Sequence, residues 1–529
     1  MADTPADPPG PARTGADALA GALLRHAGRP TVFLVTGNQN LPLVDSLGRR
    51  DVRLVHTRHE SGAGYMAEGW ARSSGEPGVY LVTAGPGLTS ALTPLASARA
   101  AEVPVILLSA SHPREHDGMG AFQELDQVQL TRHLCKASIR CLNGDQAAAV
   151  LDWAWQQAAE FPPGPVHVEL PADVLTEPAP ADRPVSWSSI PLHVLARPGQ
   201  QAGAALLRRR AQKIARSLLS AKRPLILLRP ALGRCAAAAD LGRHVPVLTV
   251  ESPRGLRDPA WVDEQELIGS ADHIALLAPA DYAVGFGAIG SAQVHAYPEA
   301  GPALLADLAT LLGRERPAAQ EDGPQAAGPA AGGTVAARRA GERAGPACSP
   351  PHPLDVAAAV DRAAGGDAVL AIDGGEFCQW IRHGLRGRLA QQLINGKLGA
   401  IGGSIPLAIG ASLHAPGRPH LAFTGDGSFG YYSAEIDTAV RHGARLTIVV
   451  GVDGSWGSEW HQQQARFGGR SYATAIGGPR YSLVAQGYGA HGSEADDAAQ
   501  FERQLTAALA GAGVSCLAVR IQRAASPAL

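Results

Sequence analysis

The sequence predicts an α/β protein with three doubly wound parallel sheets. Short apolar runs rich in Val, Ile and Leu alternate with helical segments, the pattern of parallel strands covered by helices on both faces. A Pro-rich stretch (178–200) and an Ala-, Gly- and Pro-rich stretch (315–353) interrupt it and indicate a connector and a flexible linker. We therefore expect a mobile tail, a first domain, a middle domain, a linker and a last domain at residues 1–17, 18–185, 186–312, 313–352 and 353–529.

The composition argues against several classes of protein. The formal net charge is −2 and the isoelectric point about 6.8, so the chain lacks the basic character of a nucleic-acid-binding protein. No apolar run is long enough to cross a bilayer, and no signal peptide opens the chain. The six cysteines are scattered, without a CxxC or zinc spacing. We expect a cytoplasmic protein with reduced thiols that binds neither nucleic acid nor a membrane.

The first domain begins with a buried type of strand at 31–36, which ends in Gly37, Asn38, Gln39 and Asn40. Further elements follow in alternation, with strands expected at 51–56, 78–83, 103–109 and 165–170, and helices at 43–47, from 59 onward and from 88 to about 101. A loop between 112 and 127 is marked by two glycines.

Glu60 lies in the first turn of the second helix of this domain. The helix dipole favours a carboxylate there, so the residue alone is explained by an ordinary N-terminal charge. Small residues follow it at positions 61–64 and 67, and they permit close helix packing.

The middle domain is expected to contain an Arg-rich helix at 204–219 and strands at 223–228, 245–250 and 280–288. No GxGxxG follows its first strand, only Pro230 to Gly233, so we favour a structural spacer over a nucleotide-binding domain.

The last domain contains a strand at 421–424 that runs into Gly425-Asp426-Gly427, then a helix at 431–442 and a strand at 445–451. A loop at 452–458 brings Asp453 to the end of that second strand. Ligands of open α/β sheets bind at the carboxyl ends of strands, and carboxylates together with phosphate suit Mg²⁺. A glycine–aspartate–glycine turn is common by itself. The second carboxylate at the end of the next strand favours a ligand-binding site over an ordinary turn.

Residues 421–460 (LAFTGDGSFGYYSAEIDTAVRHGARLTIVVGVDGSWGSEW) resemble the diphosphate-binding motif of thiamine diphosphate enzymes. The resemblance implies a cofactor-binding segment comprising Gly425, Asp426, Gly427, Ser428, Asp453 and Ser455. It further implies that Asp426, Asp453 and the backbone carbonyl of Ser455 hold Mg²⁺. The usual Asn-Asn pair of the family is Val452-Asp453 here, and the aspartate still supplies an oxygen.

The segments RHE and GYMAEGWAR, AGPGLTSALTPLASA and VPVILLSAS, in this order, resemble the pyrimidine-binding domain of the same enzymes. The resemblance implies that Glu60 bonds the aminopyrimidine ring of the cofactor, a task that needs a dry site and a raised pKa. LINGKLGAIGGSIPLAIG resembles the segment that props the cofactor into its bent shape, with Ile401 as the prop and the backbone carbonyl of Gly399 directed toward the ring as an acceptor.

Two further stretches suggest where a substrate would react. AFQE resembles the cofactor loop of acetolactate synthase-like and hydroxyacyl-CoA lyase-like members and makes Gln123 the matching polar residue. His116 lies near a histidine pair of pyruvate decarboxylase relatives, and Glu459 lies where those enzymes have a catalytic glutamate. A solvated loop histidine and a solvated helix charge are the alternatives. The expected substrate pocket is completed by Asn38, Gln39, Trp456 and Trp460.

The resemblance implies a thiamine diphosphate- and Mg²⁺-dependent enzyme that decarboxylates a 2-oxo acid and then ligates or protonates the intermediate, as acetolactate synthases and pyruvate decarboxylases do. A carbon–carbon lyase of the 2-hydroxyacyl-CoA or benzaldehyde type is an alternative. A non-catalytic cofactor-binding paralogue is another, allowed by Val452-Asp453. In the family the two cofactor-binding domains of a site come from different subunits, which implies a homodimer or homotetramer.

Overall fold

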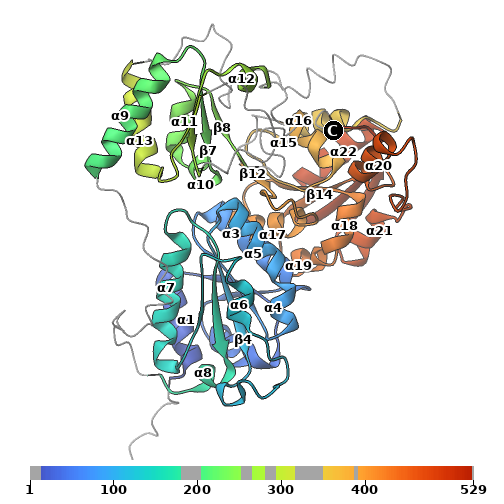
Figure 1. Cartoon of the computed structure of the whole chain (residues 1–529). Coiled ribbons are helices and arrows are strands. Elements are labelled where there is room, and N and C mark those ends of the chain that lie inside the picture. Colours follow the sequence, from blue (N-terminus) through green and yellow to red (C-terminus); the bar gives the residue numbers. More distant parts are fainter. Residues whose placement is uncertain are drawn as a thin grey trace, which may run out of the picture. The chain divides into compact units, whose positions relative to one another are not determined.

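The structure is a computed structural model that describes residues 13–179, 204–251, 265–279, 293–315, 349–385 and 391–526. It contains three parallel sheets with alternating helices, which confirms the predicted α/β class (Figure 1). Two compact units contain them: the first sheet belongs to one unit, and the second and third sheets belong to the other. Most of the predicted connector and linker, the predicted strand at 280–288 and residues 1–12 of the predicted tail lie outside the described residues.

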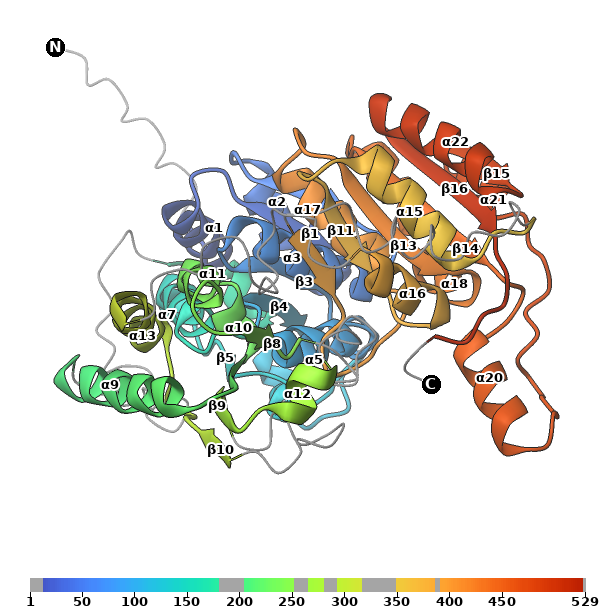
Figure 2. The ribbon, with the colours of Figure 1, turned by 90° about the horizontal axis from the view of Figure 1, so that it is seen from above.

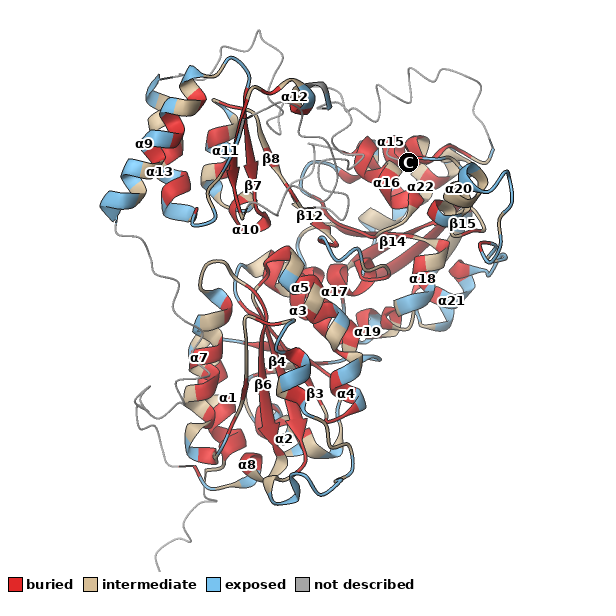
Figure 3. Cartoon of the chain, viewed as in Figure 1, coloured by how far each residue is buried: buried red, intermediate tan, exposed pale blue. Residues whose placement is uncertain are grey.

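The first sheet has six parallel strands in the order β2-β1-β3-β4-β6-β5. The strands are β1 (Thr31–Leu34), β2 (Arg53–His56), β3 (Gly78–Val82), β4 (Val105–Ser111), β5 (Ala137–Arg140) and β6 (Val166–Pro171). The helices are α1 (Gly15–His26), α2 (Leu41–Gly48), α3 (Glu60–Ser74), α4 (Pro86–Ser90), α5 (Leu92–Ala101), α6 (Gln127–Thr131), α7 (Ala147–Ala159) and α8 (Ala172–Thr176), with short 3₁₀ turns η1 (Asn38–Asn40), η2 (Arg114–His116) and η3 (Gly144–Gln146). The strands β1, β3, β4 and β6 are buried along their whole length because helices cover both faces (Figure 3).

Helix α1 corrects the predicted tail, whose last residues are helical. Thr14 caps the helix with a reciprocal pair of bonds: its hydroxyl accepts from the Asp17 amide at 3.3 Å, and the Asp17 carboxylate accepts from the Thr14 amide at 3.1 Å. Leu19 and Leu23 then enter the core that α1 shares with α7. The alanine-rich sequence concealed a helix that this cap and this packing stabilise.

The second sheet has four parallel strands in the order β10-β9-β7-β8. Its elements are β7 (Pro224–Leu228), β8 (Val247–Thr249), β9 (His273–Leu277), β10 (Gln293–Ala296), α9 (Ala204–Ser220), α10 (Pro230–Gly233), α11 (Ala236–Gly242), α12 (Gln265–Ser270) and α13 (Pro302–Glu315). At the turn after β7, the carboxylate of Glu102 accepts from the amide of Ala231 at 3.0 Å and pairs with Arg229 at 2.6 Å. A protein carboxylate thus occupies the turn where a nucleotide phosphate would approach such a sheet.

The third sheet repeats the strand order of the first, as β12-β11-β13-β14-β16-β15. Its strands are β11 (Val369–Ile372), β12 (Gln391–Ile394), β13 (His420–Gly425), β14 (Leu446–Val452), β15 (His491–Ala495) and β16 (Val514–Arg520). Its helices are α15 (Pro353–Ala364), α16 (Glu376–Gly384), α17 (Ser404–His414), α18 (Asp426–Tyr432), α19 (Glu435–Arg441), α20 (Gly457–Arg466), α21 (Tyr481–Gly487) and α22 (Ala498–Ala510). Helices α15, α16 and α22 pack together on one face, and α20 extends away from the sheet (Figure 2).

Two details of this domain differ from the prediction. The helix predicted at 431–442 is two helices, α18 and α19, and the first begins at Asp426 itself because Gly425 is extended (φ −77°, ψ 162°) and leads straight into it. The loop predicted at 452–458 is shorter, since α20 begins at Gly457. The predicted end is close: α19 ends at Arg441 with His442 as its cap, and Gly443 just beyond has a φ of 67°, a conformation that favours glycine.

Each six-stranded sheet has a point where the strand order reverses, which we call its switch point. In the third sheet β11 lies between β12 and β13, and in the first sheet β1 lies between β2 and β3. The crevice outside the carboxyl ends of the strands at such a point is where open α/β sheets bind ligands. The residues that follow β11, β13, β1 and β3 are therefore the places to look for a site.

Candidate active site

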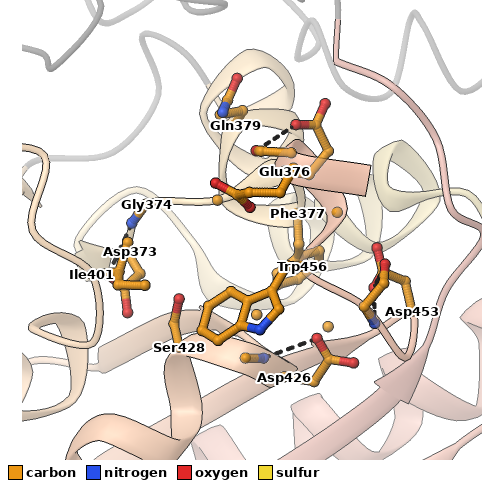
Figure 4. Close-up of a pocket in the computed structure, with 18 of the residues that line it drawn as sticks. Asp373, Gly374, Glu376, Phe377, Gln379, Ile401, Asp426, Ser428, Asp453 and Trp456 are labelled. Atoms are coloured by element: carbon orange, nitrogen blue, oxygen red, sulfur yellow. Dashed lines mark hydrogen bonds between the residues drawn. The ribbon is translucent and has the colours of Figure 1, made fainter. Parts of the chain in front are cut away.

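A pocket of about 270 Å³ opens at the switch point of the third sheet. Its walls come from the segments that follow β11, β12, β13 and β14, and they include Asp373, Ile401, Asp426, Asp453, Trp456 and Glu459. Figure 4 shows Asp426 and Asp453 on one side of this pocket and Asp373 and Ile401 on the other. The pocket therefore contains most of the residues that the sequence analysis proposed for the last domain.

Asp426 is held at the base of the pocket by backbone hydrogen bonds. One carboxylate oxygen accepts from the amide of Gly427 at 2.9 Å, and the other accepts from the amide of Gly454 at 2.7 Å. The side chain is only 4% exposed. Burial, followed by repulsion from Asp453, raises the pKa of Asp426 to about 6.

Asp453 faces the same region from the end of β14. Its Oδ1 accepts from both the amide and the hydroxyl of Ser455, each at 2.8 Å. Burial also raises the pKa of this carboxyl. Neither Asp453, which is half-buried, nor Asp426, which is buried, forms a side-chain salt bridge with another residue of the described ranges.

This donor set fits a magnesium ion bound to phosphate. Mg²⁺ prefers hard oxygen ligands, takes few of them from the protein and shares the oxygens of bound phosphates. Two carboxylates that repel each other gain from such a cation. Within the described part of the chain no group of three or more His, Cys, Asp or Glu side chains could hold a metal, so any ion here needs oxygens from outside the carboxylate pair.

Glycines allow two side chains to pack closely in the wall of the pocket. A Cβ on Gly427 would lie 2.7 Å from the ring of Trp456, and a Cβ on Gly374 would lie 2.8 Å from Cγ2 of Ile401. Gly399 has a φ of 66°, which favours glycine. The glycines at 427 and 374 therefore let Trp456 and Ile401 pack directly against the backbone that lines the pocket.

Asp373 was not proposed as a site residue, yet it organises this pocket. It is 3% exposed and accepts hydrogen bonds from the amides of Gly374 and Gly402, with further bonds from the side chains of Asn395, Ser404 and Thr424. The carboxylate thus links the glycine-rich segment carrying Ile401 to the end of β13. Its position directly after a strand, like that of Asp426, was a signal that the sequence contained.

Glu376 and Gln379, on the first turns of α16, line the pocket and were also missed. Glu376 accepts from the hydroxyl of Ser458 at 2.8 Å and from the amide of Ser526. Gln379 accepts from the hydroxyl of Ser526 at 2.8 Å. No local sequence pattern points to Ser526, because only the fold brings the chain's last described residue to this wall.

The residues proposed on α20 divide into two groups. Glu459 lines the pocket and is exposed, and its carboxylate has no hydrogen bond or salt bridge with another residue of the described ranges. Trp460 lines a neighbouring cavity instead, with the guanidinium of Arg523 4.7 Å from its ring centroid. His461 contacts Trp460 edge to face, with 4.8 Å between the ring centroids.

Among the residues proposed in the first domain, Asn38 and Gln39 follow β1 at the switch point of the first sheet, and Glu60 follows the neighbouring strand β2. Glu60 is the first residue of α3, and the side chain of the preceding His59 caps this helix. A Cβ on Gly87 would lie 3.9 Å from a carboxylate oxygen of Glu60 and 2.8 Å from Thr83. Glu60 therefore lies near the tight turn that follows β3.

The structure brings Gln39 and Gln123 together but not His116. The amide nitrogen of Gln39 donates to Oε1 of Gln123 at 3.0 Å, and the hydroxyl of Thr83 donates to Oε1 of Gln39 at 2.7 Å. Asn38 is exposed beside them. The side chain of His116 is 52% exposed and its nearest acidic neighbour is Glu115 at 3.7 Å, which fits a solvated loop histidine.

Comparison with known proteins identifies the family. Residues 13–130 match the N-terminal TPP (thiamine pyrophosphate, or thiamine diphosphate) binding domain of thiamine pyrophosphate enzymes, and residues 373–519 match the C-terminal TPP binding domain. A probable acetolactate synthase of Mycobacterium bovis is 30% identical over 498 residues, which cover 89% of each chain. The chain therefore belongs to the thiamine diphosphate-dependent enzymes and binds that cofactor.

Other relatives carry different activities. The human 2-hydroxyacyl-CoA lyase 2 is 28% identical over 538 residues, 89% of this chain and 83% of the relative. A probable 2-ketoarginine decarboxylase of Pseudomonas aeruginosa is 28% identical over 536 residues, 94% and 92% of the two chains. The chain is thus an enzyme of the acetolactate synthase, decarboxylase and lyase group, which removes the non-catalytic alternative.

A solved structure supports the fold independently. The thiamine diphosphate-dependent 4-hydroxybenzoylformate decarboxylase of Rhodococcus jostii matches with a TM-score of 0.76 at 20% identity, over 96% of this chain and 99% of that chain. None of the helices in the described ranges is long and apolar enough to span a membrane.

Proposed function

We propose that this enzyme decarboxylates a 2-oxo acid, with thiamine diphosphate and Mg²⁺, and then ligates the remaining acyl unit to an acceptor or protonates it. The observation that carries the proposal is the pocket in which the paired carboxylates Asp426 and Asp453 lie with Glu459, a carboxylate without a partner among the described residues. When bound, the cofactor would supply the electron sink for the bonding pair that stays on the acyl carbon as carbon dioxide leaves. The relatives named as an acetolactate synthase and a 2-ketoarginine decarboxylase support this reaction class.

The chain's own residues have distinct tasks in this proposal. Asp426, Asp453 and the carbonyl of Ser455 hold Mg²⁺ against the diphosphate, while Ile401 and Gly399 fix the shape of the cofactor. Glu60 exchanges a proton with the aminopyrimidine ring. Glu459 is the acid or base that decides the fate of the acyl unit, since its carboxylate is available to move a proton.

The assembly and location are part of the same proposal. We expect a homodimer or homotetramer whose sites combine the two cofactor-binding domains of different subunits. We also expect a cytoplasmic enzyme, in keeping with the free thiols of Cys135, Cys141, Cys235, Cys378 and Cys516.

A carbon–carbon lyase acting on a 2-hydroxyacyl-CoA or a hydroxyketone is the second candidate. The observation that favours it is the similarity to 2-hydroxyacyl-CoA lyase 2 over most of both chains. It needs the same cofactor site and differs in the substrate.

The deciding experiment measures carbon dioxide release. Purified enzyme, Mg²⁺ and thiamine diphosphate are given a panel of 2-oxo acids, with and without an aldehyde acceptor. Release that disappears without the cofactor supports the proposal, and the product shows whether ligation follows. No release from any acid contradicts it and transfers the test to hydroxyketones and 2-hydroxyacyl-CoA thioesters.

Glu60→Gln tests the proton-transfer role. The amide keeps the size of the side chain but cannot exchange a proton, so we expect loss of hydrogen–deuterium exchange at C2 of the bound cofactor with cofactor affinity largely retained. Glu115→Gln, on an exposed side chain of the same domain, is the control and should leave exchange unchanged. Normal exchange in Glu60→Gln would remove Glu60 from this role.

A further inference from the structure

A chain of hydrogen-bonded side chains crosses the switch point of the first sheet. Thr83 follows β3, Gln39 lies in the 3₁₀ turn η1 that follows β1, and Gln123 lies in the loop beyond β4. Because β1 and β3 are adjacent and parallel, the segments after them meet at the same edge. We call these three residues the Thr83–Gln39–Gln123 chain.

The hydrogen bonds of the Thr83–Gln39–Gln123 chain all run in one direction. The hydroxyl of Thr83 donates to Oε1 of Gln39 at 2.7 Å, and Nε2 of Gln39 donates to Oε1 of Gln123 at 3.0 Å. The side-chain amide of glutamine has one acceptor oxygen and one donor nitrogen. Because the oxygen of each glutamine faces the residue before it in the series, its nitrogen points away from that residue. The last nitrogen, Nε2 of Gln123, has no hydrogen-bond partner among the described residues.

The backbone at Gln123 holds the Thr83–Gln39–Gln123 chain in a strained conformation. Gln123 has a φ of 64°, a conformation that residues other than glycine seldom adopt, and residues held in this way concentrate at functional sites. A Cβ on Gly85 would lie 2.8 Å from Cβ of Gln123, and a Cβ on Gly37 would lie 2.5 Å from Cβ of Thr83. The two glycines therefore allow contacts that no other residue would permit.

The loop before Gln123 is fixed as well. The carboxylate of Glu124 accepts from the backbone amides of Gly118, Gly120 and Ala121, at 2.6, 2.7 and 3.0 Å. Gln123 is thus anchored on its own backbone and through its side-chain oxygen, and only its amide nitrogen is left to act.

We propose that Thr83 and Gln39 are positioning residues that act through Gln123, so that the Gln123 amide nitrogen donates a hydrogen bond to an oxygen of the substrate. This inference rests on the proposed function and deepens it: the matching ligand is a 2-oxo acid that offers its carboxylate or carbonyl oxygen as an acceptor. Gln39 is then not a wall of the substrate pocket but the residue that sets the orientation of Gln123.

Two substitutions of Gln39 separate this role from a structural one. In Gln39→Glu the carboxylate can accept from both Thr83 and Gln123, so both hydrogen bonds persist but Gln123 must turn its nitrogen inward. In Gln39→Met both bonds are lost and Gln123 is free to turn. Our proposal ranks Gln39→Glu as the more damaging change for ligand binding, whereas a merely structural role ranks Gln39→Met as the more damaging.

The measurement is the affinity of the holoenzyme for an acylphosphonate, an analogue of a 2-oxo acid that does not release carbon dioxide. The probe is the monomethyl acylphosphonate matching the best acid of the carbon dioxide assay, or the acetyl compound if no acid reacts. We expect Gln39→Glu to weaken binding about tenfold or more, the loss typical of a hydrogen bond to a charged group. Gln39→Met should cost less.

A double-mutant cycle removes the effect of the added charge. If Gln39→Glu acts through Gln123, it should cost nothing further in a Gln123→Met background. If it acts by repelling the anionic probe, its cost should persist there, and the proposal fails.

Substitutions of Thr83 test whether its hydroxyl group is needed for probe binding. Thr83→Val should weaken probe binding, Thr83→Ser should restore it, and Thr89→Val should have no effect because the exposed hydroxyl of Thr89 donates only to the carbonyl of Pro86. Thiamine diphosphate affinity and the thermal midpoint should match in all these variants. A wild-type enzyme that fails to bind the probe, or a Thr83→Ser that does not recover, overturns the proposal. The carbon dioxide assay judges the proposed function separately.

Discussion

Gly427 contributes to the candidate site because it has no side chain. A Cβ there would lie 2.7 Å from the ring of Trp456 and 3.0 Å from Cδ1 of Ile476, closer than such atoms pack. We expect Gly427→Ala to displace the tryptophan ring from the wall of the pocket and to weaken thiamine diphosphate binding about tenfold, the order of effect of overpacking a tight contact. Calorimetric titration with the cofactor measures this.

Gly430→Ala is the matched control for that prediction. Gly430 lies on the same helix, α18, and a Cβ there would meet nothing within 4 Å. The substitution should leave cofactor affinity unchanged and stabilise the helix slightly, since alanine is the better helix former. Equal losses in both variants would show that helix α18, rather than the contact with Trp456, controls binding.

Asp373 should make stability depend on pH. Burial raises the pKa of this carboxyl to about 6, above its usual value, although several donors bond to it. A folded state that holds a proton more tightly than the unfolded state is stabilised at low pH, and this contribution is lost as the pH rises through about 6. Asp373→Asn should therefore show a smaller fall in thermal midpoint between pH 5 and pH 7.5 than the wild type.

Several carboxyl groups, including that of Asp426, have raised pKa values. Comparing Asp373→Asn with the wild type isolates the contribution of Asp373. Asp367→Asn, which alters an exposed side chain, should keep the full pH dependence of the wild type. An unchanged pH dependence in Asp373→Asn would show that Asp373 does not titrate in this range.

At the residue level, the sequence predicted the pocket residues that belong to recognisable motifs. It missed the residues that only the fold brings to the pocket. Asp426, Asp453, Ile401 and Glu459 all line one pocket, as their motifs indicated. Ser526 reaches the same wall from far along the chain, and the bond between Gln39 and Gln123 spans 84 residues. Such contacts follow from strand order, which no local pattern encodes.

The segment after β16 is an element without regular structure that ties together parts of the pocket. Arg523 donates to the backbone carbonyl of Asp453 at 2.9 Å, and the indole of Trp380 donates to the carbonyl of Ala524 at 2.9 Å. We expect Arg523→Ala to loosen the Asp453 loop and to speed cofactor dissociation severalfold, measured by stopped-flow dilution of the holoenzyme.

Arg520→Ala is the control for this element. Arg520 ends β16 with its side chain 71% exposed, and its guanidinium lies 3.4 Å from Asp496. Exposed ion pairs contribute little, so cofactor dissociation should match the wild type. If the cofactor dissociates at the same rate from both arginine variants, the hydrogen bond from Arg523 does not stabilise the pocket.

The elements themselves were largely predictable where apolar runs are long. Strands β1, β3, β4 and β14 lie where those runs predicted them. Strand β5 (ASIR) is short and half polar, and it is placed by pairing with β6 rather than by its own sequence. Strand β9 was not predicted, although its run HIALL is largely apolar and fully buried; the sequence predicted a strand at 280–288 instead.

At the scale of the whole molecule, the proposed assembly predicts complementation between inactive variants. Glu60→Gln and Asp426→Asn each disable one of the two cofactor-binding domains. If one site takes these domains from two different subunits, a mixed dimer contains one intact site and one doubly defective site. Coexpression should then restore about a quarter of wild-type activity, because half of randomly paired dimers are mixed and each has one working site.

Differently tagged chains allow the mixed dimers to be purified and assayed directly. Activity in the mixed dimers with none in either parent supports shared sites. Two inactive parents that stay inactive when paired would show that each site is built within one chain.

The repeated strand order of the first and third sheets has a consequence for how such an enzyme changes over time. One ligand-binding scaffold occurs twice in the chain, and its two crevices carry different chemistry: buried carboxylates at β11 and β13, and neutral amides and a hydroxyl at β1 and β3. Duplicated scaffolds can diverge separately. We therefore expect substitutions of Gln39 or Gln123 to alter substrate preference, while Glu60 in the same crevice and Asp426 and Asp453 in the other keep their proposed roles toward the cofactor.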